Sequence, residues 1–191
     1  MNIPLRSHLR TGNRHRSAQN GRIWAPSRAE QPDRTALLRQ VSNQVKERLQ
    51  NLKGSRVYFD TNTIIYFLEQ HEPYFEVIAP IFDMVGTGDI AAFTGNISIT
   101  ETLIKPIQDK NNELIQDIKS LLFDSDIFTL VDSSRATFLQ AAEIGGNNGL
   151  RSADALHFSS AVEANCQYFL TNDRGFTSAN GVEVVLLASL A

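Results

Sequence analysis

Four acidic residues occupy comparable places in the sequence, each following a short apolar run or lying in the first turn of a predicted helix. They are Asp60, Glu101, Asp154 and Asp173. Parallel strands bring their carboxyl ends to one edge of a sheet, so we expect these side chains to lie close together. Two carboxylates about 4 Å apart repel each other by about 4 kcal/mol at an effective dielectric constant near 20. A cluster of four therefore needs positive charge, from Lys105, Arg151 and Arg174 or from a divalent cation.

The chemical type of the acids indicates which cation this would be. The sequence has one cysteine, Cys166, and four scattered histidines, so no Cys or His set accompanies the carboxylates. Hard oxygen ligands of this kind favour Mg²⁺ or Mn²⁺. Taken singly, each acid also has a structural interpretation, as a turn or cap residue or as an acid favoured at a helix N-terminus. Their matching positions favour the metal site.

Short apolar runs alternate with helical stretches over residues 55–191, and these elements must position the acids. We predict strands at 57–59, 91–94, 127–131, 168–171 and 182–187. We predict helices at 61–69, 74–86, from about 98, and at 111–123, 133–144 and 152–165. The fifth of these helices should end where Gly145, Gly146 and Gly149 follow it. The alternation predicts an α/β domain with three layers, in which helices cover both faces of a parallel sheet of four to five strands.

The chain before this domain has a different composition. Residues 1–54 carry a net charge of +8, whereas residues 55–191 carry −11. Residues 1–31 contain six arginines and little apolar surface, so we expect a basic, disordered arm. Residues 32–54 predict an amphipathic helix that packs on the domain or on a partner. Its apolar stripe consists of Leu37, Val41, Val45, Leu49 and Leu52.

Length and composition exclude several classes of protein. With 191 residues, 42% hydrophobic and 20% charged, the chain is typical of one globular domain. No apolar run approaches the ~18 residues of a membrane span, so we expect a soluble protein without a membrane partner. The single cysteine excludes a disulfide framework and favours a reducing, cytoplasmic setting.

Two enzyme classes that also begin with a strand do not fit. A dinucleotide-binding enzyme needs Gly-x-Gly-x-x-Gly after the first strand, and that motif is missing. A haloacid-dehalogenase-like phosphatase needs a second aspartate two positions after Asp60, where this chain has Asn62.

Residues 56–187 resemble the PIN-domain family, and within it the VapC-type ribonuclease toxins of toxin–antitoxin pairs. The resemblance lies in the segments 57–62, 98–101, 150–157 and 169–173, of which the last two are the most specific. It implies a magnesium- or manganese-dependent endoribonuclease, with Asp60, Glu101, Asp154 and Asp173 as its metal-binding quartet. It further implies a cognate antitoxin protein and a homodimer. The rival interpretation is a catalytically inactive PIN-fold protein that binds RNA or acts as a scaffold.

Residues beside the acids have two interpretations each. The side chains that could aim the carboxylates, or make ordinary turn hydrogen bonds, are Thr61, Asn62, Thr171 and Asn172. Arg151 and Arg174 could hold an RNA phosphate or pair with the acids. Asp154 or Asp173 is favoured to orient the attacking water.

The remaining features are assigned simpler roles. His157 is interpreted as a packed helix residue rather than a ligand, and Cys166 as a buried thiol. The basic arm either adds salt-dependent contacts to RNA phosphates or is dispensable.

Overall fold

The structure, a computed structural model, describes residue 47 and residues 49–190. Strand β1 (Arg56–Phe59) is followed by helices α2 (Thr61–Leu68) and α3 (Phe75–Gly86). Strand β2 (Ala91–Gly95) precedes α4 (Ile97–Gln108), α5 (Asn112–Lys119) and a π-helical turn (Ser120–Asp124). Strand β3 (Phe128–Val131) leads to α6 (Arg135–Asn148) and α7 (Ser152–Glu163). Strands β4 (Tyr168–Thr171) and β5 (Glu183–Leu186) and a 3₁₀ turn (Leu187–Ser189) complete the described chain.

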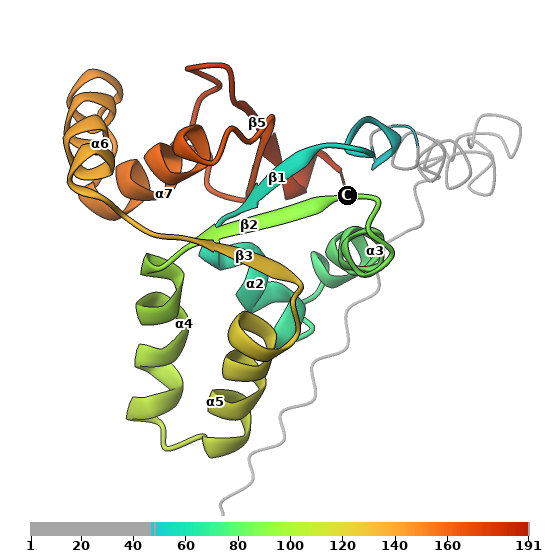
Figure 1. The fold of residues 1–191 in the computed structure, drawn as a ribbon. Helices are drawn as coiled ribbons and strands as arrows, with labels where there is room; N and C mark the ends of the chain where they lie inside the picture. The colour runs from blue at the N-terminus through green and yellow to red at the C-terminus, as the bar shows by residue number, and fades with distance from the viewer. Residues whose placement is uncertain (1–46, 48, 191) are drawn as a thin grey trace, which may run out of the picture.

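The five strands form one parallel sheet in the order β3-β2-β1-β4-β5. The chain moves outward from β1 to β2 and β3, and then crosses to β4 on the other side of β1 (Figure 1). The order therefore reverses between β1 and β4, and ligands of open α/β sheets bind at the carboxyl ends of strands at such a point. Asp60 follows β1, and Asn172 and Asp173 follow β4.

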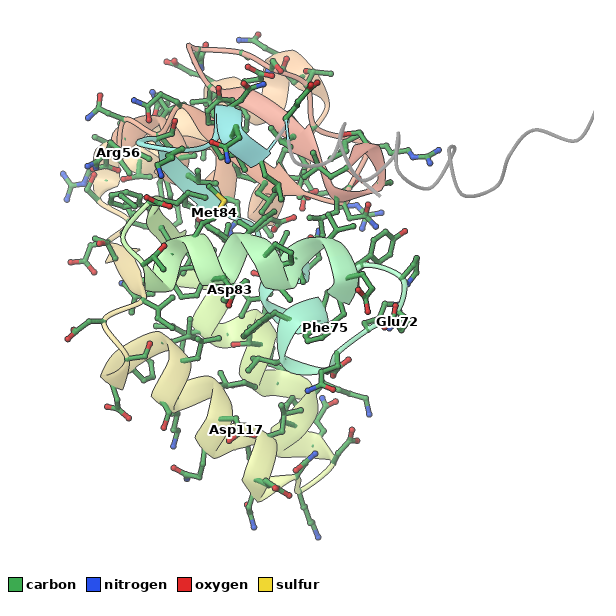
Figure 2. All side chains as sticks on the ribbon, turned by 90° about the vertical axis from the view of Figure 1, so that its right-hand side faces the viewer. Arg56, Glu72, Phe75, Asp83, Met84 and Asp117 are labelled. Carbon is green, nitrogen blue, oxygen red and sulfur yellow. The ribbon has the colours of Figure 1, made fainter. Side chains whose placement is uncertain are left out.

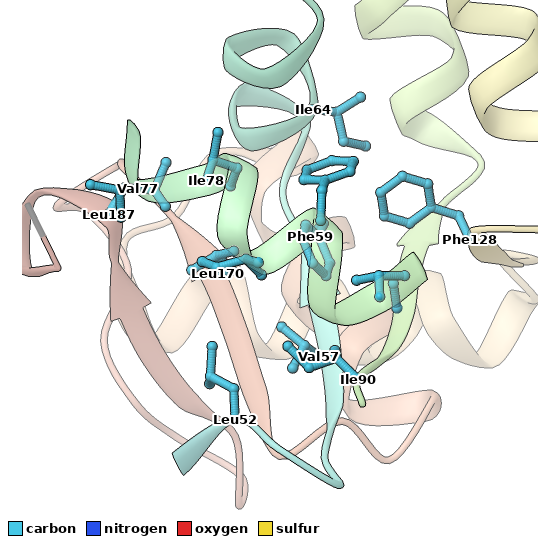
Figure 3. Packing of buried hydrophobic residues seen from close by; sticks show 14 of the residues in the cluster. Leu52, Val57, Phe59, Ile64, Val77, Ile78, Ile90, Phe128, Leu170 and Leu187 are labelled. Carbon is cyan, nitrogen blue, oxygen red and sulfur yellow. The ribbon is translucent and has the colours of Figure 1, made fainter. Parts of the chain in front are cut away.

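Alternate residues of β1 point to opposite faces of the sheet and enter separate cores. Val57 and Phe59 pack in the larger core with Ile78 of α3 and Leu170 of β4 (Figure 3). Tyr58 points the other way, into a core shared with α7. Helices α6 and α7 thus lie on one side of the strands and α2 to α5 on the other (Figure 1). The predicted α/β/α arrangement with a parallel sheet is confirmed.

Helix α3 covers much of the outer face of the larger core. It runs across the view of Figure 2 from Phe75 to Met84, and α5, which carries Asp117, lies below it in that view. Its buried residues recur at helical spacing, whereas Asp83 is exposed. Among the described residues, no helix combines the length and apolar character needed to cross a membrane.

The end of the predicted upstream helix packs on the domain. Leu49 and Leu52 are buried and belong to the larger core. These two residues therefore pack on the domain rather than on a partner. The rest of the apolar stripe and the basic arm lie outside the described residues.

The prediction that Gly145 and Gly146 end a helix is wrong. Helix α6 continues through both glycines to Asn148 and ends at Gly149, whose φ of +69° is left-handed. A Cβ atom at Gly145 would lie 3.1 Å from the Ala155 Cβ atom of α7. Close packing between α6 and α7 therefore occupies the space that a larger residue would need, and it outweighs the low helix propensity of glycine.

Smaller differences concern the ends of other elements. Helix α5 ends at Lys119 and passes into the π-helical turn, where a helix to residue 123 was predicted. Strand β5 covers Glu183–Leu186, the middle of the predicted 182–187. Element ends depend on caps and neighbouring contacts more than on periodicity.

Candidate active site at the carboxyl edge of the sheet

Asp60 lies directly after β1 and is held on both of its carboxylate oxygens. As the N-cap of α2, it accepts a hydrogen bond at Oδ1 from the Thr61 backbone nitrogen at 2.8 Å. Its Oδ2 accepts bonds from Asn62 Nδ2 and Thr171 Oγ1, both at 2.6 Å. The side chain is buried, and this burial raises the pKa of Asp60, while the nearby His157 opposes the rise.

The neighbouring polar residues connect the end of β1 to the end of β4. While the Thr171 hydroxyl donates to Asp60, it accepts from the Asp173 backbone nitrogen at 3.0 Å. Asn62 Oδ1 accepts from the Asn172 backbone nitrogen at 3.2 Å. Asn62 and Thr171 therefore contact a predicted site acid directly, whereas the Asn172 side chain accepts a hydrogen bond from the Ala188 backbone nitrogen at 3.2 Å.

Glu101 projects from α4 toward the same place. Its Oε2 accepts hydrogen bonds from Thr61 Oγ1 at 2.6 Å and from His157 Nε2 at 2.8 Å. The bond from His157 lowers the pKa of Glu101, and the bond from Thr61 acts in the same direction against partial burial. The carboxyl group is accordingly ionised at neutral pH.

His157 joins the two acids, which its interpretation as a packed residue did not anticipate. It is 1% exposed and thus packed, as predicted, but its Nε2 also lies 3.9 Å from Asp60 Oδ1. Asp60 and Glu101, which are 41 positions apart, are therefore neighbours of one imidazole nitrogen. The available signal was a histidine inside the apolar run Ala155–Phe158, where a buried polar side chain must find a partner.

The other two acids of the predicted quartet lie at the same edge of the fold but are less constrained. Asp154 is half-buried in the first turn of α7. Asp173 is exposed after β4, and its Oδ1 accepts from the Gly175 backbone nitrogen at 2.7 Å, as in a turn. Among the described residues, no three His, Cys, Asp or Glu side chains form a group that could hold a metal ion. The structure thus brings together Asp60 and Glu101, and the complete quartet stays a prediction.

The basic residues considered for the site do not pair with these acids. Arg151 and Arg174 are exposed, and neither forms a salt bridge within the part of the chain that the structure describes. Lys105 pairs with Asp109, the C-cap residue of the same helix. Both guanidinium groups are therefore available to a ligand.

The two carboxylates that meet at this edge are donors of the type that hard divalent cations bind. Asp60 and Glu101 supply carboxylate oxygens, and the hydrogen bonds to Glu101 from described residues use Oε2 and leave Oε1 without one. Cys166 is buried, and its burial raises the thiol pKa to about 12, so it supplies no thiolate. Oxygen donors without a soft ligand match Mg²⁺ or Mn²⁺.

Fold and site together define an α/β protein in which a buried aspartate and a partly buried glutamate lie at the switch point of a parallel sheet. The PIN domain family model matches residues 57–182, and the chain belongs to the PIN-domain family. This confirms the family resemblance seen in the sequence. No curated protein matches the chain significantly.

Several solved structures share the fold at low sequence identity. A chain of VapBC2 from Rickettsia felis, bound to a DNA fragment from its promoter, has a TM-score of 0.52 and 15% identity. The match covers 69% of this chain and 98% of that one. DNA-bound VapBC from Salmonella typhimurium has a TM-score of 0.52 and 14% identity, and the match covers 70% of this chain and 98% of that one. FitAB bound to an IR36 DNA fragment has a TM-score of 0.52 and 18% identity, and the match covers 69% of this chain and 94% of that one.

Proposed function

We propose that this protein is a divalent-metal-dependent endoribonuclease and the toxin of a VapBC-type toxin–antitoxin pair. It hydrolyses RNA phosphodiester bonds at a site formed by Asp60, Glu101, Asp154 and Asp173. The observation that carries the proposal is the meeting of Asp60 and Glu101 around His157 Nε2 at the sheet's switch point. Carboxylates placed together in a partly buried site need a cation, and family membership makes a nuclease the best-supported use for one.

Each acid has a role that follows from its surroundings. Asp60 and Glu101, which are held by several hydrogen bonds, bind Mg²⁺ or Mn²⁺. Held by these residues, such an ion would supply Lewis-acid activation of water and would offset the charge of the phosphate. One of the two less constrained acids, Asp154 or Asp173, orients the attacking water. Arg151 and Arg174, exposed and without acidic partners among the described residues, bind a phosphate of the RNA.

A protein partner is the second part of the proposal. One of the similar solved structures is a toxin–antitoxin complex by its title, which supports a cognate antitoxin protein. A homodimer in the cytoplasm is part of the same proposal. Large apolar residues are also exposed: Phe138 is 57% exposed and Leu139 64% on α6, and Ile104 and Ile107 are exposed on α4. Such residues support contact with another protein surface.

A catalytically inactive PIN-fold RNA-binding or scaffolding protein is the alternative. It is favoured by the finding that, within the described residues, no three candidate ligands form a metal-holding group. Cleavage and metal dependence distinguish it from the nuclease.

The test is cleavage of total RNA by the purified protein with Mg²⁺ or Mn²⁺. Discrete fragments that disappear with EDTA and with Asp60→Asn support the nuclease. The matched control is Asp83→Asn, which removes an exposed acid on α3 and should leave cleavage unchanged. Fragments that persist in Asp60→Asn reveal a contaminating nuclease, and RNA binding without cleavage favours the alternative.

A further inference from the structure

A buried chain of hydrogen bonds runs from the sheet through His157 to Glu101. Tyr58 of β1, fully buried, places its hydroxyl 2.9 Å from His157 Nδ1. The other ring nitrogen, Nε2, lies 2.8 Å from Glu101 Oε2. Both nitrogens of the imidazole therefore have partners, and these partners come from β1 and α4.

The chemistry of the partners decides which atoms donate. An ionised carboxylate only accepts, so His157 Nε2 carries a proton and donates it to Glu101. In a neutral imidazole the second nitrogen then accepts, and Tyr58 donates its hydroxyl proton to Nδ1. A hydrogen bond at each nitrogen fixes the rotation of the ring as well as its tautomer.

Packing around Tyr58 places its hydroxyl within hydrogen-bonding distance of His157. The Tyr58 ring stacks on Phe169 with centroids 5.3 Å apart and planes 7° apart. A Cβ atom at Gly95 would lie 2.6 Å from the hydroxyl oxygen, closer than real Cβ contacts. Glycine at the end of β2 therefore leaves the room that the hydroxyl occupies.

The series of hydrogen bonds ends on one carboxylate oxygen of Glu101 and leaves the other oxygen available. Oε2 accepts from both Thr61 Oγ1 and His157 Nε2, whereas Oε1 accepts from no described residue. The side chain is 35% exposed, so the carboxylate is accessible to a ligand. We propose that His157 is a positioning residue, which, oriented by Tyr58, holds Glu101 so that its free oxygen meets the divalent ion.

This inference rests on the proposed function, and its test measures Mn²⁺ affinity of the full chain, for example by electron paramagnetic resonance titration. His157→Leu removes both hydrogen bonds, and loss of such an outer partner weakens metal binding roughly 10- to 100-fold. His157→Gln places an amide nitrogen close to the position of Nε2 and should restore most of the affinity. Tyr58→Phe removes only the hydroxyl and should weaken binding in the same direction as His157→Leu.

A matched control separates positioning from general damage to the fold. Ser159 is buried on the same helix α7 and donates to the Thr137 carbonyl and to Gln140, away from both acids. Ser159→Ala should therefore lower the unfolding temperature without changing Mn²⁺ affinity. The thermal unfolding of all four variants is recorded alongside.

The possible results have distinct meanings. Weak binding by His157→Leu and Tyr58→Phe, with near-normal binding by His157→Gln and Ser159→Ala, supports the positioning role. Normal Mn²⁺ affinity in His157→Leu overturns that role while the metal site stands. Equal weakness of the Gln and Leu variants also overturns it, because the donated hydrogen bond would then be irrelevant. Wild-type protein that binds no Mn²⁺ overturns the proposed function itself.

Discussion

The Thr171 hydroxyl donates a hydrogen bond of 2.6 Å to Asp60 Oδ2 and so joins the carboxyl ends of β4 and β1. The two residues are 111 positions apart in the chain, yet their strands are neighbours in the sheet. Because Asp60 is buried, this bond stabilises its ionised form at the place where the proposed reaction needs a charged oxygen.

Replacing Thr171 by valine should reduce RNA cleavage. The valine keeps the shape of the side chain but donates no hydrogen bond, so the orientation of Asp60 is less well fixed. We expect a roughly 10- to 100-fold loss of cleavage rate at limiting Mg²⁺ with the fold retained. Thr87→Val, at an exposed threonine bonded to the Met84 carbonyl, is the control. Unchanged cleavage by Thr171→Val would show that this bond is not needed for the reaction.

Replacing Asp60 by asparagine should stabilise the metal-free fold at neutral pH. Burial raises the pKa of Asp60 above its ordinary value of 3.8, so the folded state binds the proton more tightly than the unfolded state. Ionisation of Asp60 therefore costs stability at pH 7, and that cost disappears as the pH falls through the folded pKa toward 3.8. The neutral variant avoids the cost.

Thermal unfolding in EDTA at several pH values measures this effect. We expect Asp60→Asn to unfold at a higher temperature than wild type at pH 7, with the difference shrinking as the pH is lowered. A lower unfolding temperature for the variant at pH 7 would mean that the hydrogen bonds to Asp60 outweigh its desolvation.

Two glycines near the end of α6 should respond oppositely to alanine. Gly146 is exposed, helical, and would have no atom within 4 Å of an added Cβ, so Gly146→Ala should stabilise by about 0.4–1 kcal/mol. Gly149 has a φ of +69°, and Gly149→Ala should destabilise by about 1 kcal/mol because L residues disfavour this conformation. Urea unfolding of the two single variants measures both changes. The same sign for both would contradict the described end of α6.

Removing residues 1–31 should reduce the salt dependence of RNA binding. Residues 1–31 contain six arginines and one acid, Glu30, whereas residues 55–191 carry a net charge of −11 and repel RNA overall. Each phosphate contact to single-stranded RNA adds about 0.7 to the slope of log affinity against log salt. A shallower slope for the truncated protein is expected, measured by fluorescence anisotropy at several salt concentrations. An equal slope would identify the arm as dispensable for RNA binding.

Local patterns in the sequence predicted much of this protein correctly. The apolar run Val57–Phe59 and its following Asp60 mark a strand and its end, because β periodicity and capping depend on near neighbours. The same reasoning recovered the alternation of strands and helices, but it placed Glu101 in the first turn of a helix, whereas Glu101 is the fifth residue of α4. Where local preference and packing disagree, tertiary structure determined the outcome. At Gly145, close contact with α7 keeps a glycine inside helix α6.

The contact between His157 and Glu101 also belongs to the tertiary structure. These residues are 56 positions apart, and nothing in the spacing of either segment specifies that α4 and α7 approach the same end of β1. Strand order brings the helices there, and burial then requires the imidazole to find hydrogen-bond partners. The sequence by itself determined which acids are present and on which elements, whereas the order of the sheet determined which of them meet.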